Sequence, residues 1–336
     1  MIQTIGIVSL SRGILGEDFL HHELDLGLAR LKEFGVRVKF LPHALDGLES
    51  LAAHPEHRAQ DLLDAFRDPE IDAILCAIGG DDTYRLAPYL FSNDELKNAV
   101  TKKPFLGFSD TTRNHFMLPT FYGQAFLPDV CELAPEMLPY TKRYFEEFLK
   151  TGTIREVRPS ELWYTSRTDF SPEALGTELP AHKNTGFELL QGSAQFEGEI
   201  LGGCIDSMYE MFSGWRYGDM PEVCRNYGLF PSMDDWRGKI LLMESCEEYM
   251  PPETYKKALE TLQETGVFDA VSGVLVGKPM DDMYHAEYKK LLVETISNKE
   301  LPILCNINVG HAQPRCILPF GVPAHVDADA QVIRFD

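Results

Sequence analysis

The sequence predicts an α/β protein, with a parallel sheet in its N-terminal part and a second, α+β domain in its C-terminal part. Strand and helix patterns alternate up to about residue 118, as they do in βαβ units. Shorter strand patterns follow after about residue 190, and the stretch between them is rich in Pro, Ser, Thr and Gly. We therefore expect domains at 1–157 and 191–336, joined by a linker with a mobile loop at 158–190.

The first part contains alternating strands and helices. The helix expected over Asp18–Phe34 has leucines at helical spacing and stops at Gly35. Ligands of parallel sheets bind beyond the carboxyl ends of the strands, so the residues after each strand are candidates for chemistry. The strands are expected at Thr4–Leu10, Val36–Leu41, Ile71–Ile78 and Phe105–Phe108, and the helices at Asp18–Phe34, His57–Arg67, Thr83–Leu90 and Thr111–Leu118.

The second part has a different pattern, in which strands predominate. Only two convincing helices are expected there, at Pro252–Gly266 and His285–Ser297. No internal repeat is found. The strands are expected at Ala194–Gly202, Lys239–Met243, Val271–Val276 and Ile303–Val309.

The charge of the chain excludes several classes of partner. It has 31 basic and 52 acidic side chains in 336 residues, a formal net charge of −21. Such a surplus repels nucleic acids and anionic membrane surfaces, so we expect neither as a partner. No apolar run approaches the length of a membrane span, and the N-terminus does not resemble a signal peptide, so we expect a cytoplasmic protein. Its seven scattered cysteines predict reduced thiols rather than disulfides or a zinc site.

Two turns between a strand and a helix could carry chemistry. Gly79 and Gly80, in Ile-Gly-Gly-Asp-Asp-Thr, let the backbone come close to a ligand and direct N–H groups toward negative charge. A tight turn with an aspartate cap explains the same residues equally well. Ser109, in Gly-Phe-Ser-Asp-Thr-Thr, has the position of a nucleophile on a sharp turn, with the N–H of Asp110 available for an oxyanion. Simple helix capping is the competing interpretation.

A serine nucleophile needs a general base and usually an acid that orients it. His311 is the candidate base because it follows Gly310 at the end of a strand, where a side chain is presented rather than packed. Glu244 is the candidate acid because it ends the apolar run Ile-Leu-Leu-Met. Glu247 and Glu248 compete with it for this role, although they could simply charge the start of the next helix.

Several strings occur in a recognisable order from about residue 4 to residue 322. They include Ala-Ile-Gly-Gly-Asp-Asp-Thr, Pro-Phe-Leu-Gly-Phe-Ser-Asp-Thr-Thr, Gly-Glu-Ile-Leu-Gly-Gly, Ile-Leu-Leu-Met-Glu-Ser, Val-Leu-Val-Gly-Lys and Asn-Val-Gly-His. In this order they resemble the LD-carboxypeptidase family of serine peptidases, and most closely the branch that includes the microcin C immunity protein.

The resemblance implies a role for each matched residue. Ser109 matches the nucleophile, Glu244 the acid of the triad and His311 the base. The N–H groups of Asp110 and of the Gly79–Gly80 turn match the oxyanion hole. The family implies a Rossmann-like N-terminal domain, a smaller β-rich C-terminal domain, a triad assembled from both domains, and a homodimer.

The expected reaction is hydrolysis of an amide near a free C-terminus, without a cofactor or a metal. The substrate would be a murein LD-peptide or a peptidyl or aminoacyl nucleotide. Arg85 and Arg113 are candidates for binding the substrate anion. Trp163 and Phe187 are candidates for stacking on a nucleobase, although packing of the loop explains them equally well. Cys204 stands where the family often has Asn, which puts substrate contacts at that turn in doubt.

Two functions of other classes compete with this one. A nucleotide kinase could use the Gly-Gly-Asp-Asp-Thr turn, although Asp82 stands where kinases with a similar turn have Gly. It would need ATP and Mg²⁺ and would not need Ser109. A non-catalytic protein on the same scaffold would bind its ligand equally well after Ser109→Ala.

Overall fold

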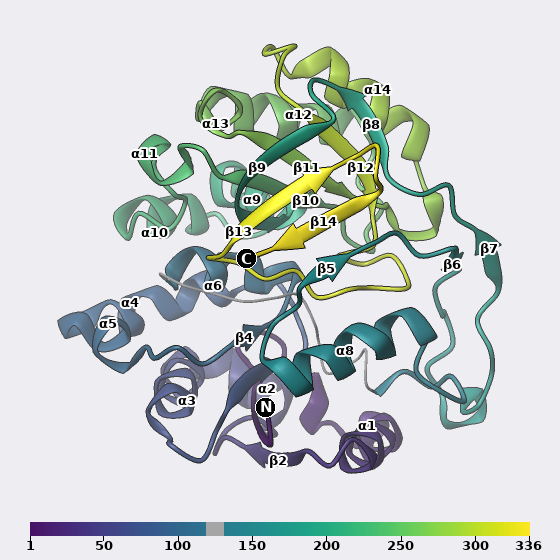
Figure 1. The fold of residues 1–336 in the computed structure, drawn as a ribbon. Coiled ribbons are helices and arrows are strands. Elements are labelled where there is room, and N and C mark those ends of the chain that lie inside the picture. The colour runs from purple at the N-terminus through teal and green to yellow at the C-terminus, as the bar shows by residue number, and fades with distance from the viewer. Residues whose placement is uncertain (119–130) are drawn as a thin grey trace. The chain divides into compact units, whose positions relative to one another are not determined.

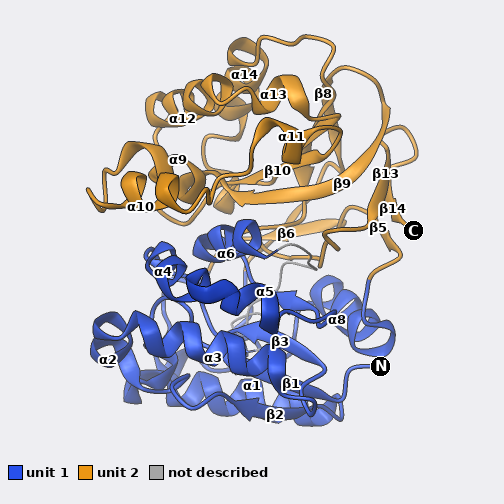
Figure 2. Cartoon of the chain, turned by 90° about the vertical axis from the view of Figure 1, so that its left-hand side faces the viewer, with its two compact units in different colours: residues 1–153, 167–179 blue, residues 154–166, 180–336 orange. Residues whose placement is uncertain are grey.

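The computed structural model describes residues 1–118 and 131–336. The chain divides into two compact units, neither of which is one continuous segment (Figure 2). Unit 1 comprises residues 1–153 and 167–179, and unit 2 comprises residues 154–166 and 180–336. The predicted fold class is confirmed, with a parallel sheet in the N-terminal part and a mixed sheet in the C-terminal part.

Unit 1 is built on a four-stranded parallel sheet with the order β2-β1-β3-β4. Its central strand β1 is apolar and buried along its whole length, as expected for a parallel strand covered on both faces. The strands are β1 (Thr4–Val8), β2 (Arg37–Phe40), β3 (Ala73–Cys76) and β4 (Phe105–Leu106).

Helices connect these strands, as the alternating pattern predicted. The helix expected at 83–90 is a short 3₁₀ turn (Thr83–Leu86) followed by α4, and another 3₁₀ turn (Ser109–Thr111) precedes α6. The α-helices in the described residues of unit 1 are α1 (His21–Glu33), α2 (Gly47–Ala53), α3 (Pro55–Arg67), α4 (Ala87–Leu90), α5 (Glu95–Ala99), α6 (Thr112–Met117) and α8 (Pro139–Thr151).

Unit 2 is built on an eight-stranded mixed sheet with the order β5-β14-β13-β9-β10-β11-β12-β8 (Figure 1). Its four middle strands β9, β10, β11 and β12 are parallel, so their carboxyl ends share one edge. The strands are β5 (Glu156–Val157), β8 (Glu188–Gln191), β9 (Gln195–Cys204), β10 (Ile240–Glu244), β11 (Gly273–Gly277), β12 (Ile303–Ile307), β13 (Pro323–Asp327) and β14 (Val332–Phe335).

The expectation of only two helices in this part was wrong. The short helix α9 starts directly at the end of β9, where the strand pattern concealed it. The other helices that were not expected, α10, α11 and α13, are too short to show a clear helical period in the sequence. The helices of unit 2 are α9 (Ile205–Ser213), α10 (Met220–Asn226), α11 (Met233–Trp236), α12 (Pro252–Glu264), α13 (Val267–Ala270) and α14 (His285–Thr295).

The stretch expected to be a linker and loop is partly regular. It contains a two-stranded antiparallel hairpin of β6 (Leu162–Tyr164) and β7 (Ala181–Lys183). All seven cysteines are buried, and none of them forms a disulfide. Among residues 1–118 and 131–336 we find no helix with the length and apolar character that a membrane span requires.

Candidate active site

Ser109 lies on a strained turn directly after β4. Its backbone has φ +60°, a left-handed conformation that residues other than glycine rarely adopt and that costs about 1–3 kcal/mol. This conformation is typical of a nucleophilic serine on a sharp strand-to-helix turn. The turn depends on Gly107, because a Cβ there would lie 2.7 Å from Oγ1 of Thr111.

The side chain of Asp110 anchors the turn that carries Ser109. Its carboxylate accepts hydrogen bonds from Oγ of Ser11 at 2.7 Å and from the backbone N–H of Thr83 at 2.9 Å. The guanidinium of Arg113 forms an ion pair with the same carboxylate. Asp110, Thr83 and Arg113 are all fully buried. The side chain next to Ser109 is therefore held rigidly.

Ser11 joins this turn to the Gly79–Gly80 turn. Its hydroxyl donates to Asp110 and accepts the backbone N–H of Asp81 at 3.0 Å. Gly80 is required at this contact, because a Cβ there would lie 2.1 Å from Oγ of Ser11. The ends of β1, β3 and β4 thus share one hydrogen-bonded hydroxyl.

Asp82 does not cap the following helical turn, which was the competing interpretation of this motif. Instead it forms a bidentate ion pair with Arg58 of α3, with distances of 2.6 and 3.1 Å. Arg58 is completely buried and also donates to the carbonyl oxygens of Leu10 and Ser11.

The backbone N–H groups expected to form the oxyanion hole are available. Within residues 1–118 and 131–336, those of Gly79, Gly80 and Asp110 donate to no acceptor. A buried N–H that donates to nothing is costly unless a ligand uses it. Two such turns at the ends of the neighbouring strands β3 and β4 are suited to binding an oxyanion.

Glu244 and His311 form a close pair within unit 2. Glu244 ends β10, which is buried at every position, and His311 follows β12. Oε2 of Glu244 lies 2.7 Å from Nδ1 of His311. A carboxylate at Nδ1 fixes the tautomer that leaves Nε2 as the basic nitrogen.

Two glycines make room for this pair. Gly310 has φ +78°, and a Cβ there would lie 2.3 Å from Oε2 of Glu244. A Cβ on Gly277, at the end of β11, would lie 2.7 Å from Cβ of Glu244. The Gly310 that precedes His311 in the sequence is therefore needed for the approach of the imidazole to the carboxylate.

The charge on His311 depends on two carboxylates. Burial alone would lower the pKa of His311, but the negative charges of Glu244 and Glu247 outweigh it and raise this pKa above its ordinary value. Oε2 of Glu247 lies 3.2 Å from Nε2, the nitrogen that a serine would approach. Sequence reasoning treated Glu247 only as a competitor of Glu244, whereas it contacts the other side of the same ring.

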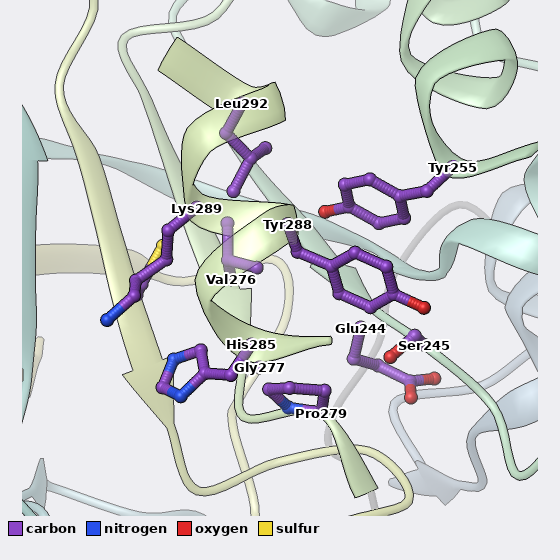
Figure 3. A pocket seen from close by; sticks show the side chains of 11 residues that line it. Glu244, Ser245, Tyr255, Val276, Gly277, Pro279, His285, Tyr288, Lys289 and Leu292 are labelled. Carbon is purple, nitrogen blue, oxygen red and sulfur yellow. The ribbon is translucent and has the colours of Figure 1, made fainter. Parts of the chain in front are cut away.

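A small cavity adjoins Glu244 within unit 2 (Figure 3). Its volume of about 10 Å³ is enough for about one water molecule. Ser245, Tyr255 and Tyr288 contribute to its wall, and the two tyrosine rings stack with their centroids 4.0 Å apart. Within residues 1–118 and 131–336, Oε1 of Glu244 has no hydrogen-bond partner.

Cys204 lies beside this site at the start of α9. Asp206, in the first turn of α9, accepts the backbone N–H of Cys246 at 3.0 Å. Burial raises the pKa of Asp206 to about 6, and the nearby Glu244 acts in the same direction. One potential ligand atom from each of Cys204, Asp206 and Cys246 lies within 4.8 Å of the other two.

The other residues predicted to bind substrate make contacts with the protein itself or are buried. Arg113 is buried on Asp110, and the guanidinium of Arg85 lies over the ring of Tyr84. Trp163 of β6 stacks on His182 of β7 with ring centroids 4.2 Å apart, and the ammonium of Lys278 lies 4.8 Å from the same ring. Phe187 is buried.

Comparison with known families decides the relationship of the chain. Residues 5–127 match the model of the LD-carboxypeptidase N-terminal domain, and residues 197–326 match that of the LD-carboxypeptidase C-terminal domain. The chain belongs to the LD-carboxypeptidase family. Ser109 lies within the first matched segment of this family member, and Glu244 and His311 lie within the second.

Relatives of this LD-carboxypeptidase family member include a self-immunity protein and a protein named as a murein peptide carboxypeptidase. The Escherichia coli microcin C7 self-immunity protein MccF is 26% identical over 82% of this chain and 76% of its own length. A Bacillus subtilis protein named "Probable murein peptide carboxypeptidase" is 27% identical over 90% of this chain and 84% of its own length.

A solved structure is much more similar. The MccF-like protein from Streptococcus pneumoniae, in complex with AMP, is 59% identical and covers 100% of this chain and 99% of its own, with a TM-score of 0.98. The MccF-like protein from Bacillus anthracis is 24% identical, with a TM-score of 0.77, over 98% of this chain and 95% of its own, and shows the same fold.

Proposed function

We propose that the chain is a serine carboxypeptidase-type hydrolase in which Ser109, Glu244 and His311 form the catalytic triad. The observation that carries the proposal is the buried 2.7 Å contact between Glu244 and His311, which orients a general base. The left-handed turn at Ser109, next to unpaired N–H groups, supports the role of nucleophile.

In this mechanism Nε2 of His311 takes the proton of Ser109 while Oγ attacks the carbonyl carbon of the substrate amide. The N–H groups of Asp110 and of the Gly79–Gly80 turn bind the resulting oxyanion. His311 then gives its proton to the leaving amine, which departs and leaves an acyl-enzyme. A water molecule deprotonated by His311 hydrolyses the ester and releases the acid.

For the substrate we propose an aminoacyl or peptidyl nucleotide that is linked through an amide. The support is the AMP bound to the Streptococcus pneumoniae protein, which shares 59% of its residues with this chain. The ring of Trp163 is a candidate platform for the base, because aromatic faces stack on nucleobases. His182 and Lys278 lie against this ring, so a base would take the place of one of them. A murein LD-peptide is the second candidate, favoured by the Bacillus subtilis relative.

The decisive experiment is treatment of the native chain with a serine-directed phosphonate, followed by intact mass and peptide mapping. We expect one adduct per chain, on Ser109, and none in the Ser109→Ala variant. An unlabelled native chain, or an adduct on another residue, would contradict the mechanism. Activity that needs ATP and Mg²⁺ and survives Ser109→Ala would instead identify the kinase.

The substrate is tested separately with wild-type chain and two compounds. One is an aminoacyl adenosine nucleotide with an amide link, and the other is a murein tetrapeptide with a C-terminal D-residue. We expect faster release of the nucleotide than of the D-amino acid, measured as kcat/KM. The reverse order would retain the triad and reject the nucleotide substrate.

A further inference from the structure

Three histidines stack on one another in unit 1, between the end of β2 and the start of α3. The rings of His43 and His57 have centroids 4.2 Å apart, and those of His54 and His57 are 4.7 Å apart. His43 lies in the turns after β2, whereas His54 precedes α3 and His57 is in its first turn. None of the three takes part in the proposed reaction.

A buried carboxylate orients the first of these rings. Oδ1 of Asp61, one turn further along α3, lies 2.8 Å from Nδ1 of His43, and its Oδ2 accepts the backbone N–H of His43 at 3.0 Å. The side chain of Asp61 is only 2% exposed. Metal-binding histidines commonly donate their second ring nitrogen to such a carboxylate, which fixes the ring and makes the other nitrogen more basic.

The second ring has a nitrogen without a partner. Nδ1 of His57 is buried from solvent and has no hydrogen-bond partner within residues 1–118 and 131–336. One ligand atom each from His43, Asp46 and His57 lie within 4.8 Å of one another. Ligand atoms around a tetrahedral zinc ion lie roughly 3.3 Å apart, so metal binding requires the two stacked rings to turn out of their parallel arrangement until a nitrogen of each points to the ion.

We propose that His43, Asp46 and His57 bind a divalent transition-metal ion such as Zn²⁺ through two imidazole nitrogens and one carboxylate oxygen. Imidazole is the ligand that zinc, copper and nickel share, and a carboxylate is an accepted third ligand. The formal charge of −21 also concentrates cations around the chain. The site is distinct from the proposed triad and does not depend on the proposed function.

The structure favours His43 over His54 as the second imidazole of this site. His54 and Glu56 form another possible set with His57, but Nδ1 of His54 is bound to Glu56 at 2.9 Å and both side chains are largely exposed. Among the residues that the structure describes, no buried group fixes the ring of His54 as Asp61 fixes that of His43.

The test is isothermal titration of Zn²⁺ into the full chain without an affinity tag, at pH 7.5. We expect one ion per chain, and at least a tenfold loss of affinity in each of His43→Ala, His57→Ala and Asp46→Asn. Asp46 is exposed, so its variant is expected to fold normally. Asp61→Asn retains all three ligands and is expected to lower the affinity by roughly 10–100-fold, as loss of an orienting partner does.

The controls decide which residues bind the ion. His325→Ala, an exposed histidine in unit 2, should leave the affinity unchanged, and so should His54→Ala. Zinc binding that survives both His57→Ala and Asp46→Asn would overturn the proposal. Loss of zinc affinity in Cys246→Ser would assign the ion to Cys204, Asp206 and Cys246. Loss of affinity in His54→Ala but not in His43→Ala would assign the ion to His54 and Glu56. Either outcome would also overturn the proposal.

Discussion

The carboxylate of Glu244 lies 2.7 Å from Nδ1 of His311, and the carboxylate of Glu247 lies 3.2 Å from Nε2 of the same ring. The imidazole is thus placed between one buried and one exposed acid. The buried acid suits the permanent role of orienting the ring, because its side chain is almost completely shielded from bulk solvent. The exposed acid lies beside the nitrogen that would act as the base in the proposed mechanism.

Glu244→Gln should nearly abolish hydrolysis while preserving the fold. The amide retains the shape of the side chain, but it removes the charge and favours the wrong tautomer of His311. We expect kcat to fall on the order of 10⁴-fold. The matched control is Glu248→Gln, an exposed partner of Arg216 in the same loop, which should retain activity. Equal activity of the two variants would contradict the role of Glu244.

Glu247→Gln should shift the pH profile. The negative charge of Glu247 contributes to the raised pKa of His311, so its removal lowers that pKa. A general base works in its neutral form, so the acidic limb of kcat/KM should move to lower pH. An acidic limb that stays in place, or moves to higher pH, would show that Glu247 does not act on His311. Glu248→Gln is again the control.

Gly310→Ala should impair both stability and catalysis. The new methyl group would lie on the backbone at φ +78° and 2.3 Å from Oε2 of Glu244, so the acid must move away from His311. The control is Gly238→Ala, at φ +71° with no atom within 4 Å of the new Cβ. Both variants carry the left-handed strain of about 1 kcal/mol. The larger fall in melting temperature, and the loss of kcat, should be confined to Gly310→Ala.

Ser11→Ala, a substitution in the same unit as Ser109, should slow hydrolysis. It removes the hydroxyl that joins Asp110 to the N–H of Asp81, so the buried carboxylate loses one of its donors and that N–H loses this acceptor. We expect a loss of about 1–3 kcal/mol in the free energy of unfolding and a lower kcat. Ser9→Ala is the matched control, since Oγ of Ser9 is buried and donates to the carbonyl oxygen of Ala44. An unchanged kcat in Ser11→Ala, with stability lost, would limit Ser11 to a structural role.

Asp206→Asn should change how stability depends on pH. Burial raises the pKa of Asp206 to about 6 in the folded chain, from an ordinary value of 3.8. The folded state therefore holds this proton more tightly, and the resulting stability is present below pH 3.8 and lost as the pH rises through about 6. Denaturant unfolding at pH 8 should find the variant more stable relative to wild type than at pH 4, by up to roughly 3 kcal/mol. Asp18→Asn, at a fully exposed site, should show no such trend.

The positions of most strands could be predicted from the sequence. The contacts between residues that lie far apart along the chain could not. Buried parallel strands are continuous apolar runs, so β10 and β12 were evident in the sequence. Glu244 was selected as the last residue of the first run, and His311 because it follows the second. Ser11 was missed although it follows β1, because its role depends on two turns far along the chain. A search for polar residues after every strand would have found it.

Arg58 and the hairpin of β6 and β7 were missed for other physical reasons. Arg58 lies in an amphipathic helix, where a basic residue normally indicates the exposed face. It is nevertheless buried, where Asp82 neutralises its charge and two carbonyl oxygens accept further hydrogen bonds from it. The hairpin strands have partly exposed side chains and no apolar alternation. Their pairing is visible only in three dimensions.

The discontinuity of the two units has a consequence for synthesis on the ribosome. Residues 167–179 belong to unit 1, where Arg167 binds Glu132 and the N–H of Gly176 donates to the carbonyl oxygen of Leu133. Domains normally fold as they emerge from the ribosome, in order from the N-terminus. Here the first unit cannot be completed until residue 179 has emerged, after part of the second unit has already been made. A nascent chain stalled before that residue should therefore remain sensitive to protease in its N-terminal half.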